Sequence, residues 1–159
     1  MAEFQSIRVF RTDVVREEEG VWIGITPAGI DGPRAKLARW GNKQFVDLQR
    51  ELGIKYSSEL TSADEKVKEE ATTRMYAELV ANAIVKDVKG LSLDDETEWK
   101  YTPESALEVF CDPGYHDLLE FIERKAQDST NFRPDPKPSV KDEKAAAGTL
   151  KKASSSTKK

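Results

Sequence analysis

Cys111, His116 and Asp117 are the residues best suited to nucleophilic or acid-base chemistry, because they lie close together in the sequence. A thiol or carboxylate beside an imidazole forms a catalytic pair when the two side chains meet within hydrogen-bonding distance. However, adjacent residues on a helix point about 100 degrees apart, and Cys111 lies five residues before His116. We therefore expect a surface or half-buried histidine. With one cysteine and one histidine, the sequence allows no internal disulfide and lacks the clustered ligands of usual zinc sites.

Three further motifs are incomplete. Residues 29–36 (GIDGPRAK) contain glycine and basic residues but not the spacing of a phosphate-binding loop. The acidic group Asp94, Asp95 and Glu96 could attract a cation, yet the calcium-loop pattern with its central glycine is missing, so we expect a solvated loop. The serines form no nucleophile elbow. We expect neither an enzyme nor a protein with a cofactor or bound metal.

The aromatic residues allow two interpretations. Trp22, Trp40 and Trp99 fall in or beside predicted strands and loops, so they either pack between a sheet and helices or form an exposed recognition patch. Candidate residues for partner binding are Trp22, Trp40, Phe45, Trp99, Tyr101, Lys151 and Lys152.

Charge divides the 159 residues into two unlike parts. The net charge is −4, and residues 134–159 contribute +4 through seven lysines and three acidic residues, so residues 1–133 carry −8. The tail has few large apolar residues, which predicts disorder. It could be a solubilising extension, a nucleic-acid arm or a tether for an acidic partner. The nucleic-acid interpretation is the weakest because the tail has no arginine and no aromatic residue, and the body has no basic stripe.

The sequence gives no indication of a membrane-spanning segment or a signal peptide. The longest apolar runs fall far short of the roughly 20 residues that a membrane-spanning helix needs. The acidic, mixed N-terminus has no signal-peptide pattern. We expect a soluble, intracellular protein with neither nucleic acid nor membrane among its partners.

Alternation and turn residues predict three short strands at the start of the chain. Apolar residues alternate within 4–11 and 20–26, and a third strand is favoured at 35–40. We expect these strands to form a small antiparallel sheet.

Four helices are predicted after the strands. Apolar residues at spacings of three and four predict helices at 42–52, 62–89, 103–111 and 113–128. Asn42 can cap the first helix, and Ser62 with Glu65 forms a capping-box pattern for the second. Thr102-Pro103 and Asp112-Pro113 place a cap before a proline at the first helical position. The predicted fold is a mainly helical α+β domain over 1–133, with a disordered basic tail over 134–159.

The order of several segments resembles the tail assembly chaperones of long-tailed, siphovirus-type bacteriophages. The resemblance covers roughly residues 4–133 and consists of residues 20–23 (GVWI), 38–45 (ARWGNKQF), a long helix with small residues, 101–106 (YTPESA), Asp112-Pro113 and 131–133 (NFR). Several of those chaperones are mainly or wholly helical, whereas the first 40 residues here predict strands.

The resemblance implies a non-enzymatic role in tail morphogenesis in the cytoplasm of the bacterial host. Such proteins bind the tape measure protein, bring tail tube subunits to it and are typically absent from the finished particle. Self-association is a further possibility. The alternative hypothesis is a structural virion protein of the tail or of the head-tail connector, motivated by the strands and tryptophans near the start of the chain.

Overall fold

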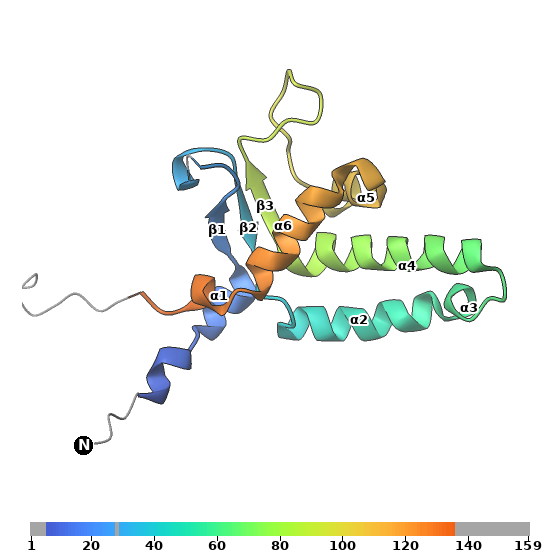
Figure 1. Cartoon of the computed structure of the whole chain (residues 1–159), viewed down its shortest axis with the longest axis horizontal. Helices are drawn as coiled ribbons and strands as arrows, with labels where there is room; N and C mark the ends of the chain where they lie inside the picture. The colour runs from blue at the N-terminus through green and yellow to red at the C-terminus, as the bar shows by residue number, and fades with distance from the viewer. Residues whose placement is uncertain (1–5, 28, 136–159) are drawn as a thin grey trace, which may run out of the picture.

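The computed structural model describes residues 6–27 and 29–135, in which a three-stranded antiparallel sheet lies beside several helices (Figure 1). The α-helices are α1 (Val14–Glu19), α2 (Lys43–Lys55), α3 (Ser57–Leu60), α4 (Glu65–Leu79), α5 (Pro103–Cys111) and α6 (His116–Gln127). The strands β1 (Val21–Gly24), β2 (Arg34–Leu37) and β3 (Val85–Lys89) lie in the order β1-β2-β3. The predicted mainly helical α+β fold with a small antiparallel sheet is confirmed.

Two of the three predicted strands are present. Strand β1 lies within 20–26, and β2 overlaps 35–40 but starts one residue earlier and ends at Leu37. The two strands pair antiparallel, with Trp22 opposite Lys36. The strand predicted at 4–11 is wrong, because Ile7–Phe10 is a 3-10 helix; residues 4 and 5 lie outside the described residues. The side chains of Ile7 and Phe10 are 85% and 77% exposed. Helix α1, capped by Asp13, stands where the turn of a hairpin was expected, and the outer edge of β1 pairs with no strand among the described residues.

The long helix predicted at 62–89 is wrong over its last five residues, Val85–Lys89, which form a strand, and it starts three residues late, at Glu65. Helix α4 ends at Leu79, a π-helical turn follows over Val80–Ile84, and the chain then enters β3. Of the apolar residues that continue the helical pattern, Val80 and Ile84 are buried in the π-helical turn, and Val88 is buried in β3, which pairs with β2. The capping box predicted at Ser62 is also wrong, because Asp64 caps α4 by accepting from the Lys66 N–H at 3.0 Å.

The remaining helix starts follow the predicted caps. The Asn42 side chain accepts from the Phe45 N–H at the start of α2, which continues three residues beyond the predicted end. Thr102 and Ser105 form a capping box around Pro103 at the start of α5. Asp112 caps a 3-10 turn, Pro113–Tyr115, that leads directly into α6.

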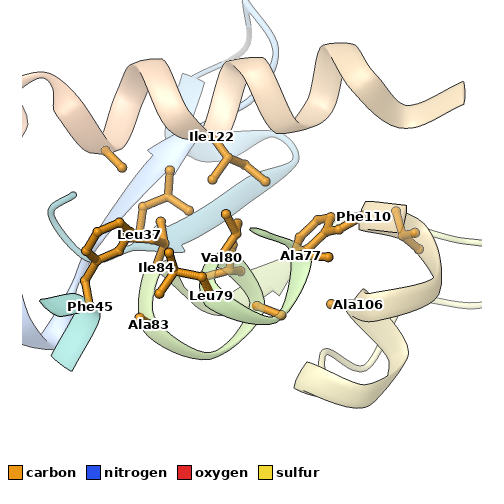
Figure 2. Packing of buried hydrophobic residues seen from close by; sticks show 14 of the residues in the cluster. Leu37, Phe45, Ala77, Leu79, Val80, Ala83, Ile84, Ala106, Phe110 and Ile122 are labelled. Atoms are coloured by element: carbon orange, nitrogen blue, oxygen red, sulfur yellow. The ribbon is translucent and has the colours of Figure 1, made fainter. Parts of the chain in front are cut away.

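The core lies where the π-helical turn meets β2, α5 and α6 (Figure 2). Three almost fully buried alanines, Ala77, Ala81 and Ala83, lie in the turn and at the end of α4, beside the larger buried side chains of Val80 and Ile84. The small alanine side chains let the neighbouring backbones approach closely, and Leu37 and Ile122 fill the space opposite. The core is therefore built around the place where α4 changes into β3.

Helices α2 and α4 lie side by side, joined through α3, and extend away from the sheet (Figure 1). A polar contact ties them together, because Glu78 accepts hydrogen bonds from the Tyr56 hydroxyl and from Lys55 Nζ at 2.9 Å. Burial opposes ionisation of Glu78, but these bonds and nearby positive charges outweigh it and hold its pKa below the ordinary value.

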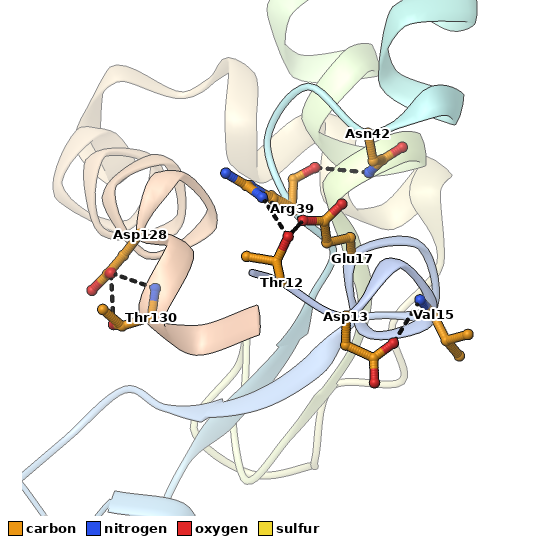
Figure 3. A network of polar contacts seen from close by, with 8 residues as sticks. All are labelled: Thr12, Asp13, Val15, Glu17, Arg39, Asn42, Asp128 and Thr130. Atoms are coloured by element: carbon orange, nitrogen blue, oxygen red, sulfur yellow. Dashed lines mark hydrogen bonds and ion pairs between the residues drawn. The ribbon is translucent and has the colours of Figure 1, made fainter. Parts of the chain in front are cut away.

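A network of polar contacts joins both ends of the described chain to the link between β2 and α2 (Figure 3). Glu17 accepts from the Thr12 hydroxyl and from the Arg39 guanidinium, and its carbonyl accepts from the Arg39 N–H at 2.8 Å. The Trp40 N–H donates to the Ala126 carbonyl at the end of α6, at 2.9 Å. Helix α1 and the end of α6 are thus fixed to one linker.

The expected disordered tail at 134–159 lies outside the described residues, apart from its first two. The last described residue, Asp135, pairs with Arg16 at 2.8 Å, although its side chain is largely exposed.

Candidate partner-binding surface

The aromatic residues predicted for partner binding do not form one surface. Trp40 and Phe45 contact each other near the start of α2, with ring centroids 4.7 Å apart, and Tyr76 of α4 lies 5.9 Å from Trp40. Phe45 is 5% exposed. These rings join α2 to α4, which is the core-packing alternative for Trp40 and Phe45.

Trp99 and Tyr101 form a second, separate aromatic pair, 5.5 Å apart. Trp99 is 7% exposed, and its Nε1 donates to the Ser105 hydroxyl at 3.0 Å. The Tyr101 hydroxyl donates to the Ala81 carbonyl in the π-helical turn at 2.5 Å. Burial raises the pKa of Tyr101, which keeps this donor protonated. The pair anchors the segment before α5 to the core.

Trp22 stands apart from both groups, half-buried on the sheet. The Arg34 guanidinium lies 5.5 Å and the Lys89 ammonium 5.0 Å from the centroid of its ring. The other two candidates, Lys151 and Lys152, lie outside the described residues.

The residues considered for catalysis are not arranged as a catalytic pair. Among the hydrogen bonds of the described chain, none joins Cys111, His116 and Asp117 through their side chains. Burial raises the pKa of the Cys111 thiol, which disfavours the reactive thiolate.

Asp94, the first carboxylate of the acidic loop before α5, accepts hydrogen bonds from other residues of that loop. Asp94 accepts from the backbone N–H groups of Thr97 at 2.8 Å and Glu96 at 3.0 Å, and from the hydroxyls of Thr97 and Ser92. These bonds hold the pKa of Asp94 well below its usual range. Within residues 6–27 and 29–135, no three His, Cys, Asp or Glu side chains gather so as to hold a metal ion. No helix in the same residues is long and apolar enough to cross a membrane.

An open groove with a volume of about 710 Å³ lies between α4 and the corner where α5 meets α6. We call it the α4 groove. Its first wall is the polar face of α4, and its second wall is the end of α5 and the start of α6. It is lined by Lys66, Glu69, Glu70, Thr73, Arg74, Phe110, Cys111, Asp112, Pro113, His116 and Leu119.

Helical periodicity explains why these side chains meet. Lys66, Glu69, Glu70, Thr73 and Arg74 recur at spacings of three and four, which places them on one face of α4. Helix α5 stops at Asp112-Pro113 and α6 starts in a new direction, so apolar residues on both sides of the corner line the groove. The groove therefore has charged and apolar parts side by side.

Comparison with known proteins identifies the family. Residues 40–142, more than half of the chain, match the family described as YdaY prophage protein. The chain belongs to this family. The matched region contains α2, α4, α5 and α6, and therefore both walls of the α4 groove. No curated protein and no solved structure was found to match. The predicted phage origin is thus confirmed at the level of a prophage protein family.

Sequence reasoning did not identify the α4 groove. It selected large aromatic residues, whereas the groove is lined by charged residues, one threonine and a few apolar residues. The signal available was a charged face on a long helix, followed by two helices that meet at a proline. That pattern is also typical of a solvated helix face, so it could not locate a groove without the tertiary packing.

Proposed function

We propose that this YdaY-family protein is a tail assembly chaperone, which binds the tape measure protein through the α4 groove and helps to recruit tail tube subunits. Three observations support the proposal. The order of segments resembles such chaperones, the chain belongs to a prophage protein family, and an open groove lies within the matched residues. The groove is the observation that carries it, because it offers a place for a partner helix.

The chemistry of the α4 groove fits an amphipathic helix. Apolar side chains of such a helix, at spacings of three and four, would contact Phe110, Leu119 and Pro113. Its charged flanks would meet the mixed rim of Lys66 and Glu69. The resemblance implies a partner with long helical segments, and these supply the required pattern.

The size of the groove agrees with reversible binding. A chaperone must release its client. Standard stable interfaces bury about 1,200–2,000 Å², and a groove formed by one face of α4 and the α5–α6 corner offers contact for a few helical turns. Charged rim contacts are weakened by salt and add speed and specificity more than affinity.

A pair of neighbouring threonines on α4 gives a matched test. Thr73 lines the groove, whereas the adjacent Thr72 does not, and both side chains are exposed. We expect Thr73→Arg to fill the groove and to weaken binding of the tape measure protein from the same phage by about tenfold or more, or about 1.4 kcal/mol. Thr72→Arg adds the same charge outside the groove and should leave the affinity within about twofold.

Binding is measured with purified full-length proteins by titration calorimetry, and complex formation by size-exclusion chromatography. A wild-type protein that forms no complex with the tape measure protein would contradict the proposed function. Equal affinities of the two threonine variants would retain the chaperone role but reject the groove as its site.

Mass spectrometry of purified virions separates the chaperone from the alternative of a structural virion protein. The chaperone should be absent from the particle or far below one copy per structural subunit. Stoichiometric presence would favour the structural alternative instead.

A further inference from the structure

The outer face of the sheet gathers positive charge from β2 and β3 beside Trp22 of β1. Antiparallel pairing places Trp22 opposite Lys36 and Arg34 opposite Lys89, and side chains alternate along each strand. Trp22, Arg34, Lys36 and Lys89 therefore lie on one face, with Asp87 opposite Lys36. We call these residues the outer sheet face.

The opposite face of the same strands is apolar and joins the core. Ala35 and Leu37 of β2 and Val88 of β3 are buried on that side. The half-buried Ile23 of β1 packs against the same core. The sheet is thus two-sided, and its charged side is turned away from the core.

The outer sheet face contrasts in charge with the rest of the body. It has three cations and one carboxylate, although residues 1–133 carry a net charge of −8. Asp87 is partly occupied by a bond from the Val88 N–H at 2.8 Å. Lys86, next to this face, has its pKa lowered by burial and then by the charge of Lys36, which agrees with an excess of positive charge there.

We propose that the outer sheet face binds an acidic segment of a partner protein. Arg34 and Lys36 are two residues apart on one strand, so they lie about 6.6–6.8 Å apart along it. An extended peptide with carboxylates at every second residue has the same spacing. Its carboxylates can bind Arg34 and Lys36 in register, with Lys89 beside them, through charge-assisted hydrogen bonds.

A nucleic acid fits this face less well than an acidic peptide. Single-stranded nucleic acids need aromatic rings on which bases stack. The face has one such ring, Trp22, and Arg34 and Lys89 already lie over it. The acidic remainder of the body would also repel a long chain of phosphates.

This surface is separate from the proposed chaperone site. Trp22, Arg34 and Lys36 precede residue 40, where the family match begins, and none of them lines the α4 groove. Failure of one proposal therefore leaves the other standing.

The test uses the full-length chain and fluorescently labelled decaglutamate, followed by fluorescence anisotropy. We expect binding that weakens as salt rises from about 50 to about 200 mM. The charge reversal Lys36→Glu with Lys89→Glu should weaken it by about tenfold or more, because two attractions become two repulsions. The control Arg50→Glu with Arg124→Glu makes the same change in net charge at exposed positions on α2 and α6, and should alter the affinity by no more than about twofold.

Tryptophan emission gives a second measurement that needs no charge change. Decaglutamate should shift the emission of the wild-type protein, and Trp22→Phe should remove that shift, since Trp40 and Trp99 lie in other clusters. Three results would overturn the proposal: no binding by the wild type, equal weakening in both charge-reversal variants, or tighter binding of decathymidylate than of decaglutamate.

Discussion

Asn42 links three parts of the fold with one side chain, and its replacement by aspartate is a demanding test of the structure. Its Oδ1 accepts from the Phe45 N–H at 3.0 Å, which caps α2. Its Nδ2 donates to the carbonyls of Arg39 at 2.8 Å and Ala83 at 3.3 Å. Asn42 is 7% exposed, so these groups have little access to water. The Arg39 bond is visible in Figure 3.

Asn42→Asp separates the cap from the two donated hydrogen bonds. Aspartate and asparagine are about equally good N-caps, so the change of capping residue alone predicts no loss of stability. The variant, however, places a carboxylate oxygen against the Arg39 and Ala83 carbonyls. Losing two hydrogen bonds of about 0.5–1.5 kcal/mol each, and burying a charge, should cost about 2–4 kcal/mol. At about 3 °C per kcal/mol for a chain of this size, the Tm should fall by roughly 6–12 °C.

Urea denaturation gives the free energy of unfolding, and calorimetry gives the Tm. The matched control is Asp64→Asn at the exposed cap of α4, which should change stability by less than about 0.5 kcal/mol. Burial should raise the pKa of the new carboxyl in Asn42→Asp, so part of the lost stability should return as the pH falls and the carboxyl becomes protonated. An Asn42→Asp protein as stable as the wild type at neutral pH would refute the bridging role of Asn42.

Three other changes test the core and its polar contacts. Leu79 is 4% exposed, and Leu79→Ala should lower the free energy of unfolding in urea by about 2–5 kcal/mol. The control Val46→Ala, at a residue that is 43% exposed, should lower it by less than about 0.5 kcal/mol. Equal losses would contradict the assigned core. The folded state lowers the pKa of Glu78, so the ionised side chain stabilises the protein at pH values above its unfolded-state pKa. This stabilisation is lost as the pH falls through the folded-state pKa. Glu78→Gln should therefore reduce the loss of stability between about pH 6 and pH 3. An unchanged pH dependence would show that Glu78 contributes no such stability. Tyr101→Phe removes the donor to the Ala81 carbonyl and should cost about 1–3 kcal/mol by thermal or urea denaturation; wild-type stability would show that this bond contributes little.

Helices α2, α5 and α6 and two strands were predictable because they depend on local signals, whereas the short helices α1 and α3 were not predicted. Asn42, Thr102 and Asp112 each have the side chain that a cap requires, and each stands at the start of its helix. The turn residues between β1 and β2 likewise marked a reversal. These features depend on a few neighbouring residues, which the sequence displays directly.

The third strand was not predictable by periodicity. Val80, Ile84 and Val88 continue the apolar spacing of α4, and a buried strand and a buried helix are both apolar. Burial against β2 decides between them, and that contact joins residues about fifty positions apart. The β-branched side chains of β3 favour a strand, but this preference is weaker than a continuous helical pattern.

The two proposed surfaces depend still more on tertiary contacts. The outer sheet face combines Trp22, Arg34, Lys36 and Lys89 from three strands, so no stretch of sequence shows a basic stripe. The sequence also left open whether the aromatic residues pack in the core or form a patch, and the fold buries Phe45 and Trp99.

Hydrogen–deuterium exchange of the protein, alone and bound to its tape measure protein, tests the central claim most directly. The proposed function predicts slower exchange on binding in residues 66–74 of α4 and 110–119 at the α5–α6 corner, with little change in α2. Unchanged exchange at both walls of the α4 groove, or protection confined to α2, would contradict it.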